Sequence, residues 1–154
     1  MEYYCDVVSN AIEIQVTDKV SKDFTLEAPL ELPPFTRGDP VILKLYLKNV
    51  SKADKTLNIN EPMKGYILTL HDIHGKLILP LTKENAKVEN PTVERLLPPG
   101  KIFDSNIDLT NMYDWSKEGR YYLTVMHDVL DEDGQNKLVY SNTVMLSVKS
   151  KQIN

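Results

Sequence analysis

The stretch that decides the fold runs from residue 96 to residue 125. It reads Leu-Leu-Pro-Pro-Gly at 96–100, Lys-Ile-Phe-Asp-Ser-Asn-Ile-Asp-Leu at 101–109 and Gly-Arg-Tyr-Tyr-Leu-Thr-Val at 119–125. Two prolines and a glycine turn the chain, and the two segments that follow alternate apolar and polar residues with the period of a half-buried strand. Consecutive short strands joined by turns predict an all-β protein with an antiparallel β-sandwich.

Short alternating segments and turns recur along the rest of the chain. The clearest segment is 41–49, where four apolar residues share one face and Lys44 and Lys48 lie on the other. Three prolines between residues 24 and 35 predict an edge strand or a connector there, and residues 82–95 are expected to be irregular. Further strands are predicted at 11–17, 56–59, 66–71, 76–81, 101–109, 120–126 and 138–148. We therefore expect seven to nine strands, with fewer than about a tenth of the residues in helices.

The predicted core is made of the apolar residues that share the inward faces of these strands. They are Val41, Leu43, Leu45, Leu47, Leu68, Leu70, Ile107, Leu109, Tyr121, Leu123, Val125, Val144, Leu146 and Val148. Gly119 allows a close backbone approach where the chain enters a central strand. The hydroxyl of Tyr121 is then expected to bond to the backbone of the preceding turn, as in the tyrosine corner of sandwich domains.

Length, composition and charge narrow the classes of function. The 154 residues predict one domain over 1–154, with residues 1–10 as a loose N-terminal segment. The net charge of −4 provides no basic stripe for phosphates, so nucleic acid is not a predicted partner. No apolar run approaches the roughly 20 residues of a membrane helix. Cys5 is the only cysteine, which excludes an internal disulfide, and the first residues lack the pattern of a signal peptide.

A set of turn and packing motifs between residues 38 and 148 resembles a kind of bacterial immunoglobulin-like domain. The motifs are Gly38-Asp39-Pro40, Asn49 at a strand end, Asp72…Gly75, Leu97-Pro98-Pro99-Gly100, Tyr113-Asp114-Trp115-Ser116…Gly119-Arg120-Tyr121 and Ser141-Asn142-Thr143-Val144. Similar arrangements occur in the intracellular proteinase inhibitor family of bacilli and in accessory domains of secreted bacterial proteins. The resemblance implies an immunoglobulin-like sandwich, a protein partner such as a protease or a cell-envelope component, and an extracytoplasmic location.

Histidine and carboxylate residues provide two candidate metal sites. His71-Asp72-Ile73-His74, with His127, suggests a metal-dependent hydrolase fragment as an alternative function. On a strand, however, His71 and His74 have opposite parity, so we predict an exposed hairpin tip at which Asp72 caps the turn.

The acidic segment 128–136 is similar to a calcium loop, but its first carboxylate is displaced and the final Glu is missing. A hairpin turn at Asp133-Gly134 is therefore preferred, and weak calcium binding stays open.

Catalytic motifs are missing from the sequence. There is no Gly-x-Ser-x-Gly elbow and no glycine-rich phosphate loop, so we predict no catalytic residue, no cofactor and no resident metal. The leading hypothesis is a non-enzymatic protein-interaction or accessory module, with a proteinase inhibitor as one form. Its predicted contact surface is Pro98, Pro99, Gly100, Tyr113, Trp115, Asp133 and Gly134.

Two of these contact residues have a second interpretation. An aromatic pair in a turn, such as Tyr113 and Trp115, can be a binding hot spot, but it more often closes the end of a sandwich. A carbohydrate-binding module is a further alternative. It requires Trp115, Tyr113 or Tyr66 to be exposed as a flat stacking surface.

Overall fold

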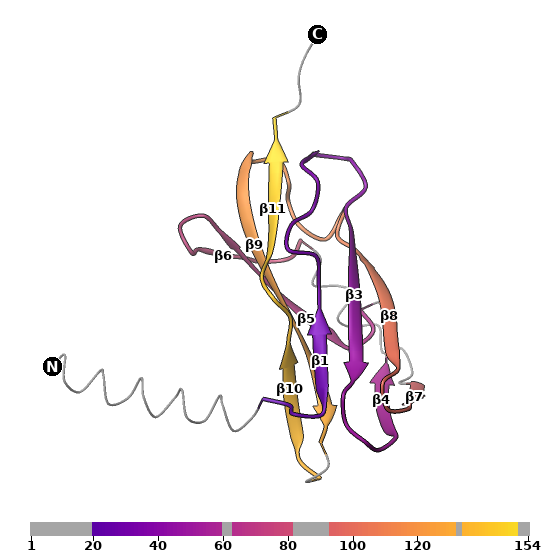
Figure 1. Cartoon of the computed structure of the whole chain (residues 1–154). Helices are drawn as coiled ribbons and strands as arrows, with labels where there is room; N and C mark the ends of the chain where they lie inside the picture. Colours follow the sequence, from indigo (N-terminus) through magenta and orange to yellow (C-terminus); the bar gives the residue numbers. More distant parts are fainter. Residues whose placement is uncertain (1–19, 60–62, 82–92, 132–133, 151–154) are drawn as a thin grey trace, which may run out of the picture.

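Eleven strands and no helix make up the part of the chain that the computed structural model describes, which is residues 20–59, 63–81, 93–131 and 134–150 (Figure 1). The strands are β1 (Phe24–Glu27), β2 (Phe35–Thr36), β3 (Ile42–Asn49), β4 (Lys55–Ile59), β5 (Tyr66–Asp72), β6 (Leu77–Ile78), β7 (Val93–Leu97), β8 (Ile102–Asp108), β9 (Gly119–Leu130), β10 (Asn136–Tyr140) and β11 (Val144–Lys149). Across these ranges, no helix is long and apolar enough to cross a membrane.

The strands form three sheets. One has the order β1-β3-β8, and a six-stranded sheet has the order β2-β11-β9-β5-β6 with β10 also paired to β9. The third sheet pairs β4 with β7. All strand pairs are antiparallel except β2 with β11. The fold is therefore the predicted antiparallel β-sandwich, but the described residues form eleven strands where seven to nine were predicted; nine of the eleven have four or more residues.

The core lies between the sheets and follows the alternation of the sequence. In β3 every second side chain is buried, from Leu43 to Asn49, and β9 buries the odd-numbered residues from Tyr121 to Val129. This pattern follows from the two-residue period of a strand, which sends alternate side chains to opposite faces. All the predicted core residues are buried except Leu68, which is half-buried and packs against the core.

An aromatic cluster fills one end of the sandwich. The ring centroid of Trp115 lies 5.2 Å from that of Phe35, 5.5 Å from that of Tyr113 and 5.7 Å from that of Tyr121. The indole Nε1–H donates a 3.0 Å hydrogen bond to the Leu109 carbonyl. Trp115 and Tyr113 are each 3% exposed, so the pair closes the end of the sandwich, in agreement with the second interpretation of these residues.

Tyr121 forms the predicted corner. Its ring is buried, and its hydroxyl donates a 2.8 Å hydrogen bond to the Lys117 carbonyl in the turn before β9. Gly119, at φ +140°, begins the strand. Burial, with smaller contributions from the carboxylates of Asp72 and Asp114, raises the pKa of Tyr121 above its usual value.

Some strand boundaries differ from the predicted ones. Residues 93–95 belong to β7 and are not irregular, because they pair with β4. The segment predicted as one strand over 138–148 is divided into β10 and β11, which lie along the same edge of β9. Ser141 bridges the interruption, since its Oγ accepts a hydrogen bond from the Val125 amide and its amide donates to the Val125 carbonyl. The predicted strand at 11–17 lies outside the described residues, as do residues 1–10 and 82–92.

Candidate functional site

The structure does not bring the three histidines together. His71 lies on the outer side of β5, His74 is exposed in the β5–β6 turn, and His127 is buried in β9. Tyr66 is the cross-strand partner of His127, so His71 lies five residues further along β5, roughly 17 Å away. Among the residues that the structure describes, no three potential ligands are grouped so that they could hold a metal ion.

The β5–β6 turn has the predicted capping geometry. The Asp72 carboxylate accepts 2.9 Å hydrogen bonds from the backbone N–H groups of Lys76 and His74. Both bonds lower the pKa of the Asp72 carboxyl below its usual value, and the bond from Lys76 makes the larger contribution. Gly75 has φ +80°, as the turn requires. The carboxylate of this motif therefore stabilises a turn.

The buried side chain of His127 has a structural role. Its side chain is 1% exposed, with Nδ1 2.8 Å from the Asp128 carbonyl oxygen and Nε2 3.0 Å from the Lys64 carbonyl oxygen. Each ring nitrogen therefore faces a backbone carbonyl oxygen, and these two contacts hold the ring in place. Gly65 is needed beside this ring, since a Cβ there would lie 2.7 Å from Nε2.

This role of His127 was not predicted from the sequence. The alternation that turns Tyr121, Leu123 and Val125 inward also turns His127 inward, so the pattern contained the signal.

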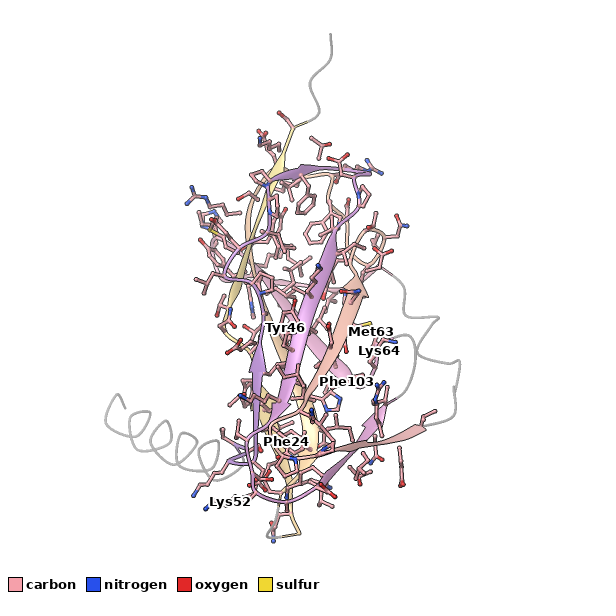
Figure 2. All side chains as sticks on the ribbon, turned by 45° about the vertical axis from the view of Figure 1, so that its right-hand side comes forward. Phe24, Tyr46, Lys52, Met63, Lys64 and Phe103 are labelled. Atoms are coloured by element: carbon pink, nitrogen blue, oxygen red, sulfur yellow. The ribbon has the colours of Figure 1, made fainter. Side chains whose placement is uncertain are left out.

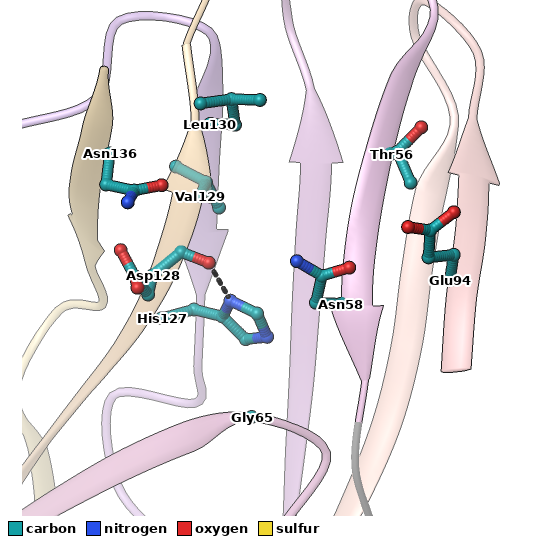
Figure 3. A pocket seen from close by; sticks show the side chains of 9 residues that line it. All are labelled: Thr56, Asn58, Gly65, Glu94, His127, Asp128, Val129, Leu130 and Asn136. Atoms are coloured by element: carbon teal, nitrogen blue, oxygen red, sulfur yellow. Dashed lines mark hydrogen bonds between the residues drawn. The ribbon is translucent and has the colours of Figure 1, made fainter. Parts of the chain in front are cut away.

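A groove of about 480 Å³ opens beside His127, between β9 and β10 on one side and β4 and β7 on the other (Figure 3). Its lining residues are Thr56, Asn58, Gly65, Glu94, His127, Asp128, Val129, Leu130 and Asn136. The polar groups are carboxylates, amides and one threonine hydroxyl. Both nitrogens of its only histidine face carbonyl oxygens, and the other polar groups of the groove offer hydrogen bonds to a ligand.

The acidic segment 128–136 forms the hairpin between β9 and β10. The Asp131 amide donates to the Gln135 carbonyl, and Gly134 has φ +78°. The buried Asp131 carboxylate accepts hydrogen bonds from Ser21 Oγ at 2.6 Å and from the Lys22 amide at 3.0 Å. This carboxylate therefore ties the chain near Ser21 to the hairpin, a contact between residues 110 apart that sequence analysis missed.

The predicted contact residues are distributed over both ends of the sandwich. Pro99, Gly100 and Gly134 are exposed in turns and Pro98 is half-buried, while Asp133 lies outside the described residues. The rings of Tyr113 and Trp115 are buried in the aromatic cluster, as described above. Tyr66 is also buried, so none of the three rings that the carbohydrate alternative requires is exposed for stacking on a sugar.

On the outer face of the six-stranded sheet, neighbouring strands place residues without charge side by side. The pattern of any single strand does not show this. Cross-strand partners share a face, and three consecutive rows of partners lie outward here. The rows are Tyr140–Met126–Ile67, Thr124–Thr69 and Met145–Tyr122–His71–Leu77, and the exposed Glu31 borders the third row through its bridge to Met145. None of these nine residues is Asp, Glu, Lys or Arg, and we call them the low-charge face. Ile67, Leu77 and Tyr140 are exposed, and the other six are half-buried.

The outer face of the β1-β3-β8 sheet has the opposite character. Its outward residues are Thr25, Glu27, Ile42, Lys44, Tyr46, Lys48, Ile102, Asp104, Asn106 and Asp108. Half of these ten residues are charged, with both signs present. Tyr46, labelled in Figure 2, and Ile42 are the exposed apolar residues of β3 on this face. Two outer faces of one molecule therefore differ sharply in charge.

Comparisons with known proteins yield structural similarities only. No family model and no curated protein sequence matches this chain. A PapD-like domain of human CEP192 is 11% identical over 86% of this chain and 89% of that domain, with a TM-score of 0.46. The major subunit AggA of aggregative adherence fimbriae type I from Escherichia coli is 13% identical over 84% and 98% of the two chains, with a TM-score of 0.44. A non-cellulosomal cohesin from Archaeoglobus fulgidus is 14% identical over 83% and 92%, with a TM-score of 0.36. These similarities concern the fold alone.

Proposed function

We propose that this chain is a non-enzymatic protein-interaction module that binds its partner through the low-charge face. The observation that carries the proposal is the contrast between the two outer sheet faces. The outward side of an antiparallel sheet normally faces water and carries polar and charged residues, as the β1-β3-β8 sheet does. The low-charge face departs from this rule over three consecutive rows, in which Ile67, Leu77 and Tyr140 are exposed.

The dimensions of the low-charge face suit a contact patch. Strands lie about 4.8 Å apart and rise about 3.3 Å per residue, so four strands by about five residues cover roughly 300–400 Å². Apolar patches of this size on single chains are often functional. Charged residues border the patch along β9, with Arg120 at one end and Asp128 at the other. An apolar centre with a charged rim is the usual anatomy of a protein interface.

The chemistry of the groove supports a binding role over catalysis. His127 has both ring nitrogens against carbonyl oxygens, and His71 and His74 lie elsewhere. A metal-dependent hydrolase would need these groups to converge on one point. The groove therefore contributes hydrogen-bonding capacity to the surface of the module.

The resemblance noted in the sequence supports a proposal for the class of partner. Similarity of the turn motifs to bacterial proteinase inhibitors and accessory domains would make the partner a protease or a cell-envelope component. The exposed turns at Pro99-Gly100 and Gly134 stay a second predicted contact region. In this proposal the low-charge face forms the centre of the interface.

Two isoleucines provide a matched test. Ile67 is 49% exposed on the low-charge face, and Ile42 is 42% exposed on the charged face. A library of random displayed peptides is selected against the full chain, and the affinities of the enriched peptides are measured for Ile67→Lys and Ile42→Lys. We expect Ile67→Lys to weaken binding at least about tenfold, which corresponds to about 1.4 kcal/mol, because it places a charge in the apolar centre.

The control variant should leave the affinity within about twofold of the unmodified chain, since Ile42 lies on the opposite sheet. Thermal unfolding of both variants establishes that each is folded. Equal losses in the two variants, or a library in which no peptide distinguishes them, would contradict the proposal.

A further inference from the structure

Another pocket lies where the low-charge face ends. The β5–β6 hairpin projects from the side of the sandwich (Figure 1), and a pocket of about 330 Å³ lies between its turn and the start of β9. Arg120 lines this pocket and is two residues from Tyr122 on the same side of β9, roughly 7 Å beyond the third row of the face. Lys76 lines it from the hairpin, next to Leu77 of that row. The pocket is therefore continuous with the low-charge face.

The pocket is lined by three permanently charged cations, which are Lys76, Lys117 and Arg120. All three residues are exposed, and none forms an ion pair with another residue that the structure describes. The carboxylates of the pocket are those of Asp72 and Glu118, so the cations outnumber them even before His74 is counted. In a chain whose net charge is −4, this is a local excess of positive charge.

One of the two carboxylates is engaged by the turn. Asp72 accepts hydrogen bonds from the backbone N–H groups of His74 and Lys76. The bond from Lys76 is the largest cause of the low pKa of Asp72, and the charges of His74 and Lys117 lower this pKa further. Lys117 is therefore shared with Asp72. The side chains of Lys76 and Arg120 are the main donors that the pocket offers to a further anion.

The size and the walls of the pocket narrow the class of anion. Ile73, Ile78 and the ring of Tyr121 provide apolar walls beside the cations. Pockets that hold a whole small molecule begin at about 300 Å³, so this one has room for a single carboxylate and its aliphatic stem. A nucleic acid would need a longer basic surface than three side chains provide.

We propose that this pocket binds a carboxylate of the protein partner, next to the apolar residues that the low-charge face binds. Asp128 borders the other end of the face along β9, and Glu31 borders it on the β11 side at Met145. Because the charges around the face are unequal, they fix the direction in which an acidic partner lies. That orientation rests on the proposed function, whereas the binding of a carboxylate by the pocket does not.

Succinate tests the pocket by itself. It is titrated into the isotope-labelled full chain while the backbone amide NMR signals are recorded, and sodium chloride at the same ionic strength serves as the reference. We expect saturable shift changes at Ile73 and Gly119, which line the pocket, and none at Gly134 in the β9–β10 hairpin. Changes that are absent, or that sodium chloride reproduces, overturn the inference.

Two double variants connect the succinate signal to named side chains. Lys76→Gln with Arg120→Gln should abolish the shift changes, and its exposed positions leave the core intact. Lys44→Gln with Lys48→Gln removes the same charge from the outer face of β3 and should leave the changes in place. Thermal unfolding establishes that both variants are folded. Equal effects of the two variants overturn the inference.

A peptide selected from a displayed library with free C-terminal ends identifies the source of the carboxylate. It is synthesised with Asn and Gln in place of its Asp and Glu residues, and separately with an amidated C-terminus. We expect one of these changes to weaken binding to the unmodified chain about three- to tenfold, and to have no effect on the Lys76→Gln, Arg120→Gln variant. Loss on amidation identifies a chain end, and loss in the other peptide identifies a side chain.

The possible failures are distinguishable. If neither change weakens the peptide, or if both chains lose affinity equally, the pocket does not bind the partner's carboxylate and the inference is overturned. If succinate binds as expected but Ile67→Lys leaves the affinity for peptides unchanged, the proposed function fails and the carboxylate site stands.

Discussion

Two buried tyrosines should respond in opposite directions to the same substitution. Tyr66 is 4% exposed, and its hydroxyl lies near that of the buried Ser105; among the described residues, neither hydroxyl makes a hydrogen bond of good geometry. The Tyr121 hydroxyl, in contrast, donates to the Lys117 carbonyl at 2.8 Å. Replacement by Phe removes an unsatisfied polar group at the first position and a satisfied hydrogen bond at the second.

The magnitudes follow from the cost of burying a polar group. An unpaired buried hydroxyl costs about 1–3 kcal/mol, and Tyr66→Phe removes this cost. The variant also loses the packing contacts of the oxygen atom, so we expect a net rise of about 1 kcal/mol in the free energy of unfolding. Tyr121→Phe should lower it by roughly 0.5–1.5 kcal/mol, the usual net contribution of one hydrogen bond. In a chain of this length, 1 kcal/mol shifts the midpoint of thermal unfolding by about 2–4 °C.

The assay is thermal and urea unfolding of the unmodified chain and the two variants at neutral pH. Tyr66→Phe should have the highest midpoint and Tyr121→Phe the lowest, with unchanged urea m-values. A destabilisation by Tyr66→Phe as large as that by Tyr121→Phe would refute the reasoning. It would mean that the Tyr66 hydroxyl makes a stabilising hydrogen bond.

The Tyr66 hydroxyl also sets a dependence on alkaline pH. Burial raises the pKa of Tyr66 to about 12, and the neighbouring Ser105 opposes the rise. Since the unfolded chain releases this proton near pH 10, the folded state holds more protons between about pH 10 and pH 12. The stability contributed by neutral Tyr66 is therefore complete below about pH 10 and is lost as the pH rises, by about 1.4 kcal/mol at about pH 11. Tyr66→Phe should remove this part of the alkaline decline.

Three further substitutions test local packing and charge. Gly65→Ala should destabilise by about 2 kcal/mol or more in urea unfolding, because the residue has φ +87° and its Cβ would lie 2.7 Å from Nε2 of His127. Gly75→Ala, at φ +80° with no atom within 4 Å of its Cβ, should cost only about 1 kcal/mol, and equal costs would discredit the clash. Lys55→Met should destabilise by about 1–3 kcal/mol, because it removes the ion pair with Asp23 at 2.9 Å between two largely buried side chains. A loss below about 1 kcal/mol would show that solvent already screens this pair.

Much of the fold could be predicted because it depends on local alternation. A strand with one buried face fixes its own parity, so the inward residues of β3 and β9 were evident from the sequence. The turn at Asp72 and Gly75 and the corner at Tyr121 are equally local, and both were confirmed.

The candidate binding surface could not be predicted in the same way. The alternation within β9 is enough to place Thr124 and Met126 on its outer side. Only the register of β9 with β5 and β10 places Ile67 and Tyr140 beside them. The lack of charge is therefore a property of three strands together. Long-range contacts such as Ser21 with Asp131 were hidden for the same reason.

The central claim is that the low-charge face is the contact surface, and a peptide enriched from the displayed library tests it most directly. The peptide is titrated into the isotope-labelled full chain while the backbone amide NMR signals are recorded. We predict the largest shift changes at Thr69, Thr124 and Met126, in adjacent rows of the low-charge face. Changes concentrated instead at Asn58 in the groove, or at Gly100 in the β7–β8 turn, would contradict the account.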